Sequence, residues 1–200
     1  TTAIMPEAVG VMRSGFYQTG LRNCYFPKLI RVHDCGFFDC KIERLNSDNF
    51  PVLKQINIFG FSYCPLSSIY LPTLISVGRE CFSYCKILKE FSAPKLNEVG
   101  PGCFNGCKLL FSINCKLEPE KFTCWGCKQC PICRKEVRKC QKIGQLPEKL
   151  KEARQIQEQL MGCLIDTRGT KQSEMEQIHE VEQKFQVTQE KVVRNYPHFE

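Results

Sequence analysis

Residues 51–64 have the sequence PVLKQINIFGFSYC, and residues 72–85 have the sequence PTLISVGRECFSYC. In both segments Leu stands two positions after the proline, a β-branched residue five, Phe ten and Cys thirteen positions after it. The same template begins at Pro27 and Pro94, and a weaker copy begins at Pro6. These prolines lie 21, 24, 21 and 22 residues apart. Self-similarity at such a period predicts a solenoid of stacked repeats.

Each repeat is expected to form one coil of the solenoid. Apolar residues alternate between each repeat Cys and the next proline, as at Leu66, Ile69 and Leu71, and this pattern predicts a short strand. The part between the repeat Leu and the repeat Cys is rich in turn residues, so we expect it to return as irregular or 3₁₀-like structure. One such unit cannot bury its apolar face alone, but stacked units share a continuous core.

The repeat cysteines are Cys40, Cys64, Cys85 and Cys107. We expect them to be free thiols in the core, because free cysteine is among the most buried residue types and packs as a small hydrophobe. A disulfide ladder is the alternative. Equivalent positions in neighbouring coils lie about 5 Å apart, which falls within the Cα separation that a disulfide permits.

The pattern P-x-L-x-x-[VI]-x(3)-[small]-F-x-x-C resembles the BspA-like class of leucine-rich repeats over about residues 5–115. This chain has Gly or Cys where that class commonly has Ala before the Phe. Lys116 stands where the next proline would fall, which indicates that the array ends there. The resemblance implies a non-catalytic, protein-binding solenoid of a kind often found on cell surfaces.

A second group of cysteines follows the repeats as C-x2-C-x2-C-x2-C, at Cys124, Cys127, Cys130 and Cys133. Four thiolates satisfy the tetrahedral coordination that zinc prefers, so this spacing predicts a zinc site. Only two residues separate the two C-x2-C knuckles, and a mixed set that uses one knuckle with Cys115 or Cys140 stays open. Basic neighbours would lower the pKa of the thiols. They are Lys121, Lys128, Arg134 and Lys135.

Two other interpretations of this cluster remain, besides a thiol-rich loop without metal. An iron–sulfur cluster is less favoured, because in a bacterial ferredoxin run the fourth Cys follows three residues and precedes Pro, whereas Cys133 follows two and precedes Arg134. The string CPICR over residues 130–134 also resembles the last knuckle of a RING finger. A complete RING needs eight ligands with at least one His among them, and these are missing.

Residues 145–200 are rich in Glu, Gln, Lys and Arg and carry apolar residues at helical spacing. One stripe includes Leu150 and Leu160, another includes Ile178 and Phe185, and Gly169 lies at a turn between them. The pattern predicts a coiled coil or a helical hairpin that docks or dimerises.

Composition excludes several classes of protein. The chain carries a net charge of +7, and residues 116–151 contribute ten Lys and Arg against four Asp and Glu. The sequence contains no apolar run of membrane-spanning length, and no catalytic triad, phosphate-binding or dinucleotide motif. We therefore expect no membrane span, no enzyme and no small-molecule substrate. Nucleic acid is not expected as a partner, since only Phe122 and Trp125 accompany the basic segment.

The sequence thus predicts an α+β chain in three parts. Residues 1–115 form a leucine-rich-repeat solenoid of about five coils, residues 116–144 a zinc-binding knuckle, and residues 145–200 a helical tail. The predicted function is a non-catalytic scaffold that binds protein partners through the solenoid face and the coiled coil. Its predicted location is the cytoplasm, with the cytoskeleton as one site there. The alternatives are a RING-like ubiquitin-ligase adaptor and a secreted or cell-surface adhesin.

Overall fold

The structure is a computed structural model that describes residues 1–146. Its elements are β1 (Thr2–Ile4), β2 (Gly10–Val11), β3 (Asn23–Tyr25), β4 (Arg31–Val32), β5 (Arg44–Leu45), β6 (Gln55–Ile56), β7 (Ser68–Tyr70), β8 (Ser76–Val77), β9 (Glu90–Ser92), β10 (Glu98–Val99), β11 (Ser112–Asn114), the 3₁₀ helix η1 (Pro119–Lys121) and α1 (Val137–Gly144). The helical tail predicted over residues 145–200 lies outside the described residues, apart from its first two. The coiled coil or hairpin therefore stays a prediction.

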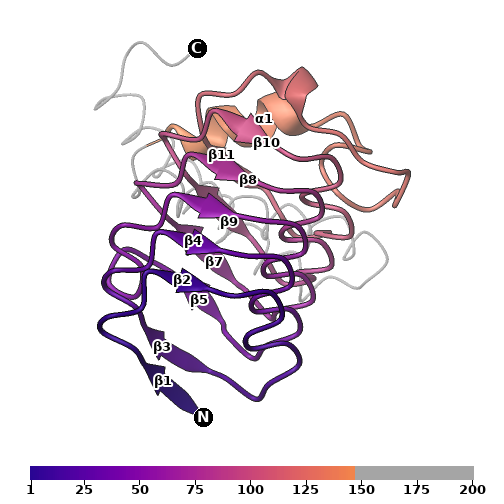
Figure 1. The fold of residues 1–200 in the computed structure, drawn as a ribbon. Helices are drawn as coiled ribbons and strands as arrows, with labels where there is room; N and C mark the ends of the chain where they lie inside the picture. Colours follow the sequence, from indigo (N-terminus) through magenta and orange to yellow (C-terminus); the bar gives the residue numbers. More distant parts are fainter. Residues whose placement is uncertain (147–200) are drawn as a thin grey trace, which may run out of the picture. The chain divides into compact units, whose positions relative to one another are not determined.

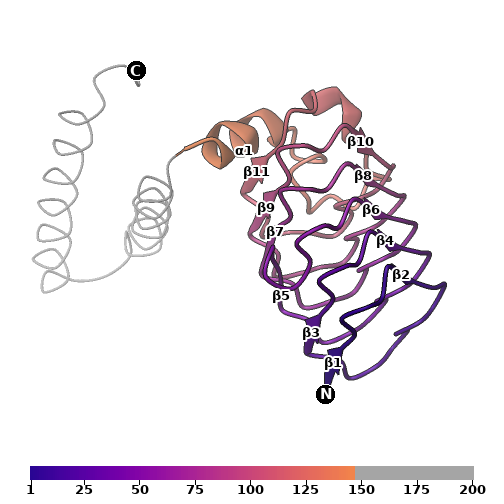
Figure 2. The ribbon, with the colours of Figure 1, turned by 60° about the vertical axis from the view of Figure 1, so that its left-hand side comes forward.

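The strands form a solenoid of about five turns in which each coil contributes two strands (Figure 1). Strands β2, β4, β6, β8 and β10 pair side by side in one sheet, and β5, β7, β9 and β11 pair in a second. The pair β1–β3 holds the first two coils together, and every ladder is parallel. Figure 2 shows the coils stacked one on the next. This arrangement confirms the predicted repeat solenoid.

One sheet was predicted and the other was not. Strands β3, β5, β7 and β9 lie in the apolar stretches before the prolines, and β11 lies in the corresponding stretch before Lys116, as expected. The part of each repeat that we expected to be irregular or 3₁₀-like instead contains a two-residue strand that ends at the β-branched position. These positions are Val11, Val32, Ile56, Val77 and Val99. The prediction was wrong because a strand of two residues is too short to show an alternating pattern.

A column of stacked phenylalanine rings, the core column, runs through the centre of the coils. Successive ring centroids lie 5.1, 4.8, 6.3, 6.0 and 6.0 Å apart. The column consists of Phe16, Phe37, Phe61, Phe82, Phe104 and Phe122. Offset stacking suits the charge distribution of aromatic rings and adds to the stabilisation from burying them. The register between neighbouring coils is therefore fixed by the largest buried side chains.

The repeat cysteines lie beside this column as free thiols. Each Sγ donates to the carbonyl oxygen of the Phe in the preceding coil, over 3.0 Å from Cys40 and Cys64, 3.3 Å from Cys85 and 3.1 Å from Cys107. Burial raises the pKa of all four thiols. The buried thiols thus link the coils by hydrogen bonds, and residues 1–146 contain no disulfide.

Residues 1–145 form one compact unit, in which the cysteine-rich segment packs on the last coil. Phe122 continues the core column past Phe104, and α1 packs against β11. Gly144 lies so close to the backbone of Ile113 that a Cβ would collide with it. The packing shows no break at residue 115. The division predicted there marks a change in sequence pattern.

Truncating one ring of the core column tests this packing. Phe61 is fully buried, so Phe61→Ala should lower the free energy of unfolding by about 3–5 kcal/mol through lost burial and the cavity left behind. Tyr70→Ala is the control, because Tyr70 is 52% exposed on β7 and its loss should cost within about 0.5 kcal/mol. Equal losses in urea unfolding of the two variants would contradict a shared aromatic core.

Candidate metal centre

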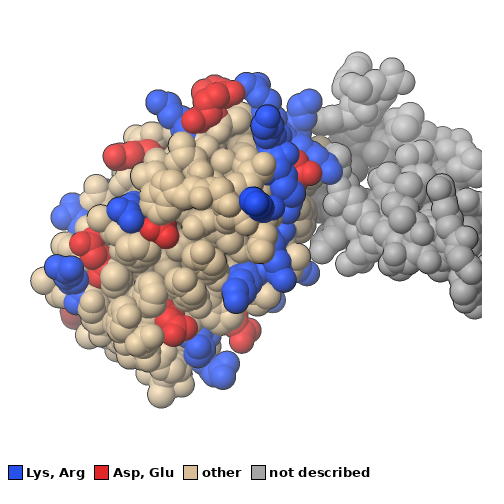
Figure 3. Space-filling model, turned by 90° about the vertical axis from the view of Figure 1, so that its right-hand side faces the viewer, with Lys and Arg blue, Asp and Glu red and all other residues tan. Residues whose placement is uncertain are grey.

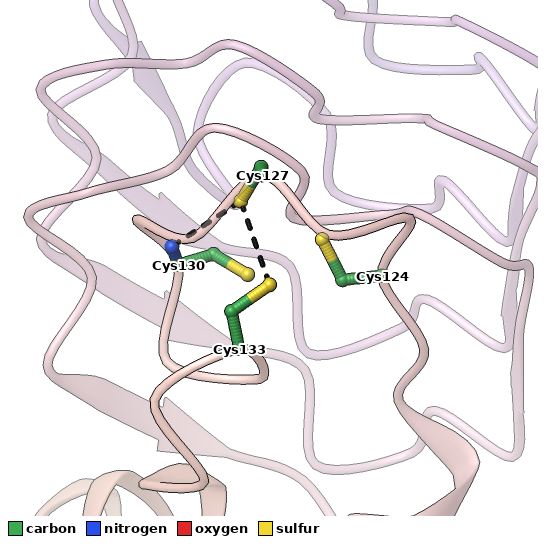
Figure 4. Close-up of side chains that lie close together, drawn as sticks. All are labelled: Cys124, Cys127, Cys130 and Cys133. Atoms are coloured by element: carbon green, nitrogen blue, oxygen red, sulfur yellow. Dashed lines mark hydrogen bonds between the residues drawn. The ribbon is translucent and has the colours of Figure 1, made fainter.

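The loop between β11 and α1 brings the four clustered cysteines together (Figure 4). The Sγ atoms of Cys124, Cys127, Cys130 and Cys133 all lie within 4.8 Å of one another. Cys127 Sγ and Cys133 Sγ are 3.9 Å apart. Zinc–sulfur bonds of about 2.3 Å in a tetrahedron place sulfurs about 3.8 Å apart. The four sulfurs are therefore arranged as one four-thiol site, and the short gap between the two knuckles does not prevent closure.

The backbone of the first knuckle turns back sharply between its two cysteines. Gly126 has a φ of +80°, and nothing lies within 4 Å of where its Cβ would stand. Lys128, directly after the second cysteine, has a φ of 60°, so the chain adopts the left-handed conformation twice within three residues. A turn of this kind directs Cys124 and Cys127 toward the same point, because the chain reverses between them.

Burial and hydrogen bonds shift the pKa values of Cys124, Cys127 and Cys130 in different directions. Burial acts to raise the pKa of Cys127, but backbone N–H groups of Gly106, Gln129 and Cys130 donate to its sulfur and lower that pKa to about 6. Burial raises the pKa of Cys124, whose Sγ donates to Asn105 Oδ1 over 3.3 Å. Burial also raises the pKa of Cys130. Since a metal binds the thiolate, Cys127 is the sulfur best prepared to bind first.

The basic neighbours do not act as the sequence suggests. The pKa of Cys127 is lowered by backbone N–H groups rather than by lysines. The Arg134 guanidinium instead clamps the loop, donating to the carbonyl oxygens of Gln129 over 2.7 Å and Lys108 over 3.1 Å and pairing with Glu136 at 2.6 Å. Arg134 thereby ties the cysteine-rich segment to the chain that leaves the last coil.

The four-cysteine cluster packs directly against the turn of the last coil. Gly102 N–H donates to the carbonyl oxygen of Thr123 over 3.1 Å, which continues the bonding between coils. The ring of Trp125 packs against Gly102 and lies 4.8 Å from the Arg79 guanidinium, a cation–π contact. The backbone N–H of Gly106, in the same turn, donates to the Cys127 sulfur. The cluster and the solenoid therefore share one packed junction.

The alternative ligands lie elsewhere. Among residues 1–146, the group of cysteines with metal-binding spacing includes neither Cys115 nor Cys140. Gln141 Nε2 approaches Cys115 Sγ at 3.9 Å, and Cys140 Sγ points to the carbonyl oxygen of Leu110 at 3.9 Å. Both side chains are buried between α1 and the last coil, where they fill space. The four consecutive cysteines thus lie together, whereas Cys115 and Cys140 lie apart from them.

The repeats and the cysteine cluster define the class of protein as a β-solenoid with a terminal thiol site. A family model described as BspA type leucine rich repeat region matches residues 11–130 in six copies, and the chain belongs to this family. The match extends beyond residue 115 into the cysteine-rich segment. The chain is thus a repeat protein of the protein-interaction or surface type.

Other comparisons add little. The chain resembles the crystal structure of the pneumococcal vaccine antigen PcpA with 15% sequence identity and a TM-score of 0.36. The similarity covers 57% of this chain and 36% of that one, so the chain spans about a third of its length. No curated protein matches the sequence. No helix within residues 1–146 has both the length and the apolarity that a bilayer span requires.

Replacing one sulfur tests the ligand set. Cys133→Ser should abolish metal binding at stoichiometric level, because three sulfurs and a neutral hydroxyl bind zinc much more weakly than four thiolates. The matched control is Cys35→Ser, since Cys35 is also partly exposed but lies outside the cluster. Elemental analysis of the purified chains should give one zinc per chain for the wild type and the control. Retention of zinc by Cys133→Ser would refute the set.

Removing the metal should loosen the junction with the last coil. Trp125 is the single tryptophan of the chain and packs at this junction, so its fluorescence reports on it directly. A zinc chelator at neutral pH should shift the Trp125 emission to longer wavelength and lower the melting temperature, because metal binding is coupled to folding of the loop. Unchanged emission and melting after complete metal removal would show that the loop folds without metal.

Proposed function

We propose that this chain is a non-catalytic protein-binding solenoid whose C-terminal coil is closed by a zinc ion bound to Cys124, Cys127, Cys130 and Cys133. The observation that carries the zinc assignment is the set of four sulfurs within 4.8 Å of one another. A single ion fits this spacing better than an iron–sulfur cluster, whose several metal atoms would hold the sulfurs farther apart. Thiolate ligands in tetrahedral geometry favour zinc among the common divalent ions.

The proposed zinc is structural. All four positions of a tetrahedral ion would be filled by protein sulfurs, whereas a catalytic zinc keeps one position for water or substrate. The ion would hold the loop in the fold that places Phe122 and Trp125 over the last coil. It would thereby protect the end of the core column from water. A terminal repeat without such a cover would expose apolar side chains and unpaired strands.

Membership of a leucine-rich-repeat family supports protein binding as the activity of the solenoid. Repeats stacked in one dimension present an extended surface on which a partner can contact several coils at once. The RING-like adaptor has less support, because a RING needs eight ligands and residues 1–146 hold one group of four cysteines.

Family membership also favours the second candidate, a secreted or cell-surface adhesin, over a cytoplasmic or cytoskeletal scaffold built on a coiled coil. BspA-type repeats cover the solenoid, whereas the predicted coiled coil lies outside the described residues. The oxidation state of the cysteines separates the two locations, since disulfides persist in oxidising compartments and are rare in the cytoplasm.

Counting thiols distinguishes these locations. The fourteen described cysteines are free in the structure, so a denatured, chelator-treated chain purified from its native source without reductant should show all fifteen cysteines of the sequence as thiols if it is cytoplasmic. A count reduced by pairs, with bridges located by mass spectrometry among the repeat cysteines, would establish the surface candidate instead. A bridge within residues 124–133 would eliminate the zinc site.

A direct test of the proposed activity uses the full chain as bait. Chemical crosslinking in the source cells should join the solenoid to a defined protein, and Phe61→Asp should abolish that crosslink because it places a charge in the core column. Equal crosslinking by wild type and by Phe61→Asp would show that a folded solenoid is not what binds.

A further inference from the structure

A second column of aromatic rings, the outer column, runs along the outside of the turns. It consists of Tyr17, Phe38, Tyr63 and Tyr84, one from each of the first four coils. Successive ring centroids lie 4.9, 5.3 and 4.8 Å apart. The three tyrosines are 36–46% exposed, unlike the rings of the core column, which are buried from Phe37 onward. The ring of Tyr84 lies over Gly106 of the fifth coil, and a Cβ on that glycine would stand 2.8 Å from the ring.

The outer column presents ring edges and hydroxyl groups rather than ring faces. The planes of Tyr17 and Phe38 differ by 8°, and those of Tyr63 and Tyr84 differ by 17°, so the rings within each of these two pairs cover each other's faces, whereas Phe38 and Tyr63 are tilted by 46°. Ring edges carry partial positive charge, and phenolic O–H groups are donors. Within residues 1–146, the structure gives the three tyrosine hydroxyls no hydrogen-bond partner. The outer column is therefore suited to a ligand that packs apolar groups against the rings and accepts hydrogen bonds from the tyrosine hydroxyls with its oxygen atoms.

Basic side chains border this side of the solenoid. Lys41, Lys86 and Lys108 each follow a repeat Cys directly and are exposed. Lys41 pairs with Asp39 at 3.4 Å, whereas Lys86 and Lys108 form no ion pair with the described residues. Figure 3 shows a row of Lys and Arg along one border of a side whose middle carries few charged groups. Residues 1–146 hold 20 Lys and Arg against 11 Asp and Glu, a net charge of +9.

We infer that the turn side of the solenoid, made of the outer column with Lys86 and Lys108 beside it, binds an acidic protein segment whose apolar residues rest on the tyrosines. The inference rests on the proposed protein-binding function and names the surface and the chemistry of the partner. Tyrosine is enriched among the residues that dominate binding energy, and a bordering positive charge selects an acidic partner and speeds its association. Single-stranded nucleic acid is less well matched, because bases bind by stacking on free ring faces, and the two stacked pairs cover the faces that their rings turn toward each other.

The experiment selects ligands for the full, zinc-loaded chain from a library of displayed random twelve-residue peptides. The selected peptides should carry Asp or Glu beside apolar residues, and their affinity should fall as salt rises. Tyr63→Ala should weaken binding at least tenfold. The double variant Lys86→Glu with Lys108→Glu should weaken it similarly, and because both lysines are exposed it should fold normally. Tyr70→Ala and Lys95→Glu, which change exposed residues outside this surface, should bind as the wild type does.

The possible results distinguish binding of an acidic segment at this surface from protein binding by the solenoid in general. Acidic peptides that bind the wild type and lose affinity in both the Tyr63 and the lysine variants support the inference. Peptides that bind all variants equally overturn it while leaving protein binding intact. Failure to select any peptide overturns it together with protein binding by the solenoid. Binding of a single-stranded oligonucleotide more tightly than the best peptide also overturns it. Circular dichroism of Tyr63→Ala checks that its fold is retained.

Discussion

The stacking of one coil on the next in fixed register is the constraint on which the rest of this structure depends. It is set jointly by the core column of phenylalanine rings, by thiols that donate to the carbonyl of the preceding coil, and by parallel ladders on two sides. Because each coil repeats the position of the one before it, a side chain placed once per repeat becomes a column along the whole solenoid. The exposed tyrosines form such a column, as do the buried rings.

A stack of this kind must end, and its end is where the second cysteine group acts. The last coil would leave Phe104 and the edges of two sheets uncovered, which is costly for apolar groups and for unpaired backbone alike. The segment that follows supplies Phe122, Trp125 and α1 as a cover, and four sulfurs converge at its centre. The cysteine cluster and the last coil of the solenoid thus pack as one unit. Binding a zinc ion there would supply the folding energy that a short loop lacks by itself.

Sequence alone predicted the elements whose signal repeats at a fixed position or has a fixed spacing. The strands before the prolines, the core phenylalanines and the convergence of Cys124 with Cys133 belong to this group. The second sheet was missed because its strands have two residues each. Phe122 was missed because it follows Phe104 by 18 residues, outside the repeat spacing. The outer column escaped the template because its aromatic shifts from one position after the core Phe, at Phe38, to two positions after it, at Tyr63.

Amide hydrogen exchange tests the register between coils most directly. Four backbone amides at equivalent positions donate to the carbonyl oxygen of the β-branched residue in the preceding coil, with N···O distances of 2.7–2.9 Å. They are His33, Asn57, Gly78 and Gly100, which donate to Val11, Val32, Ile56 and Val77. In the folded chain all four should exchange slowly, with Asn57 and Gly78 opening only in global unfolding. Exchange of Asn57 and Gly78 at the rate of an exposed amide would contradict the stacked solenoid.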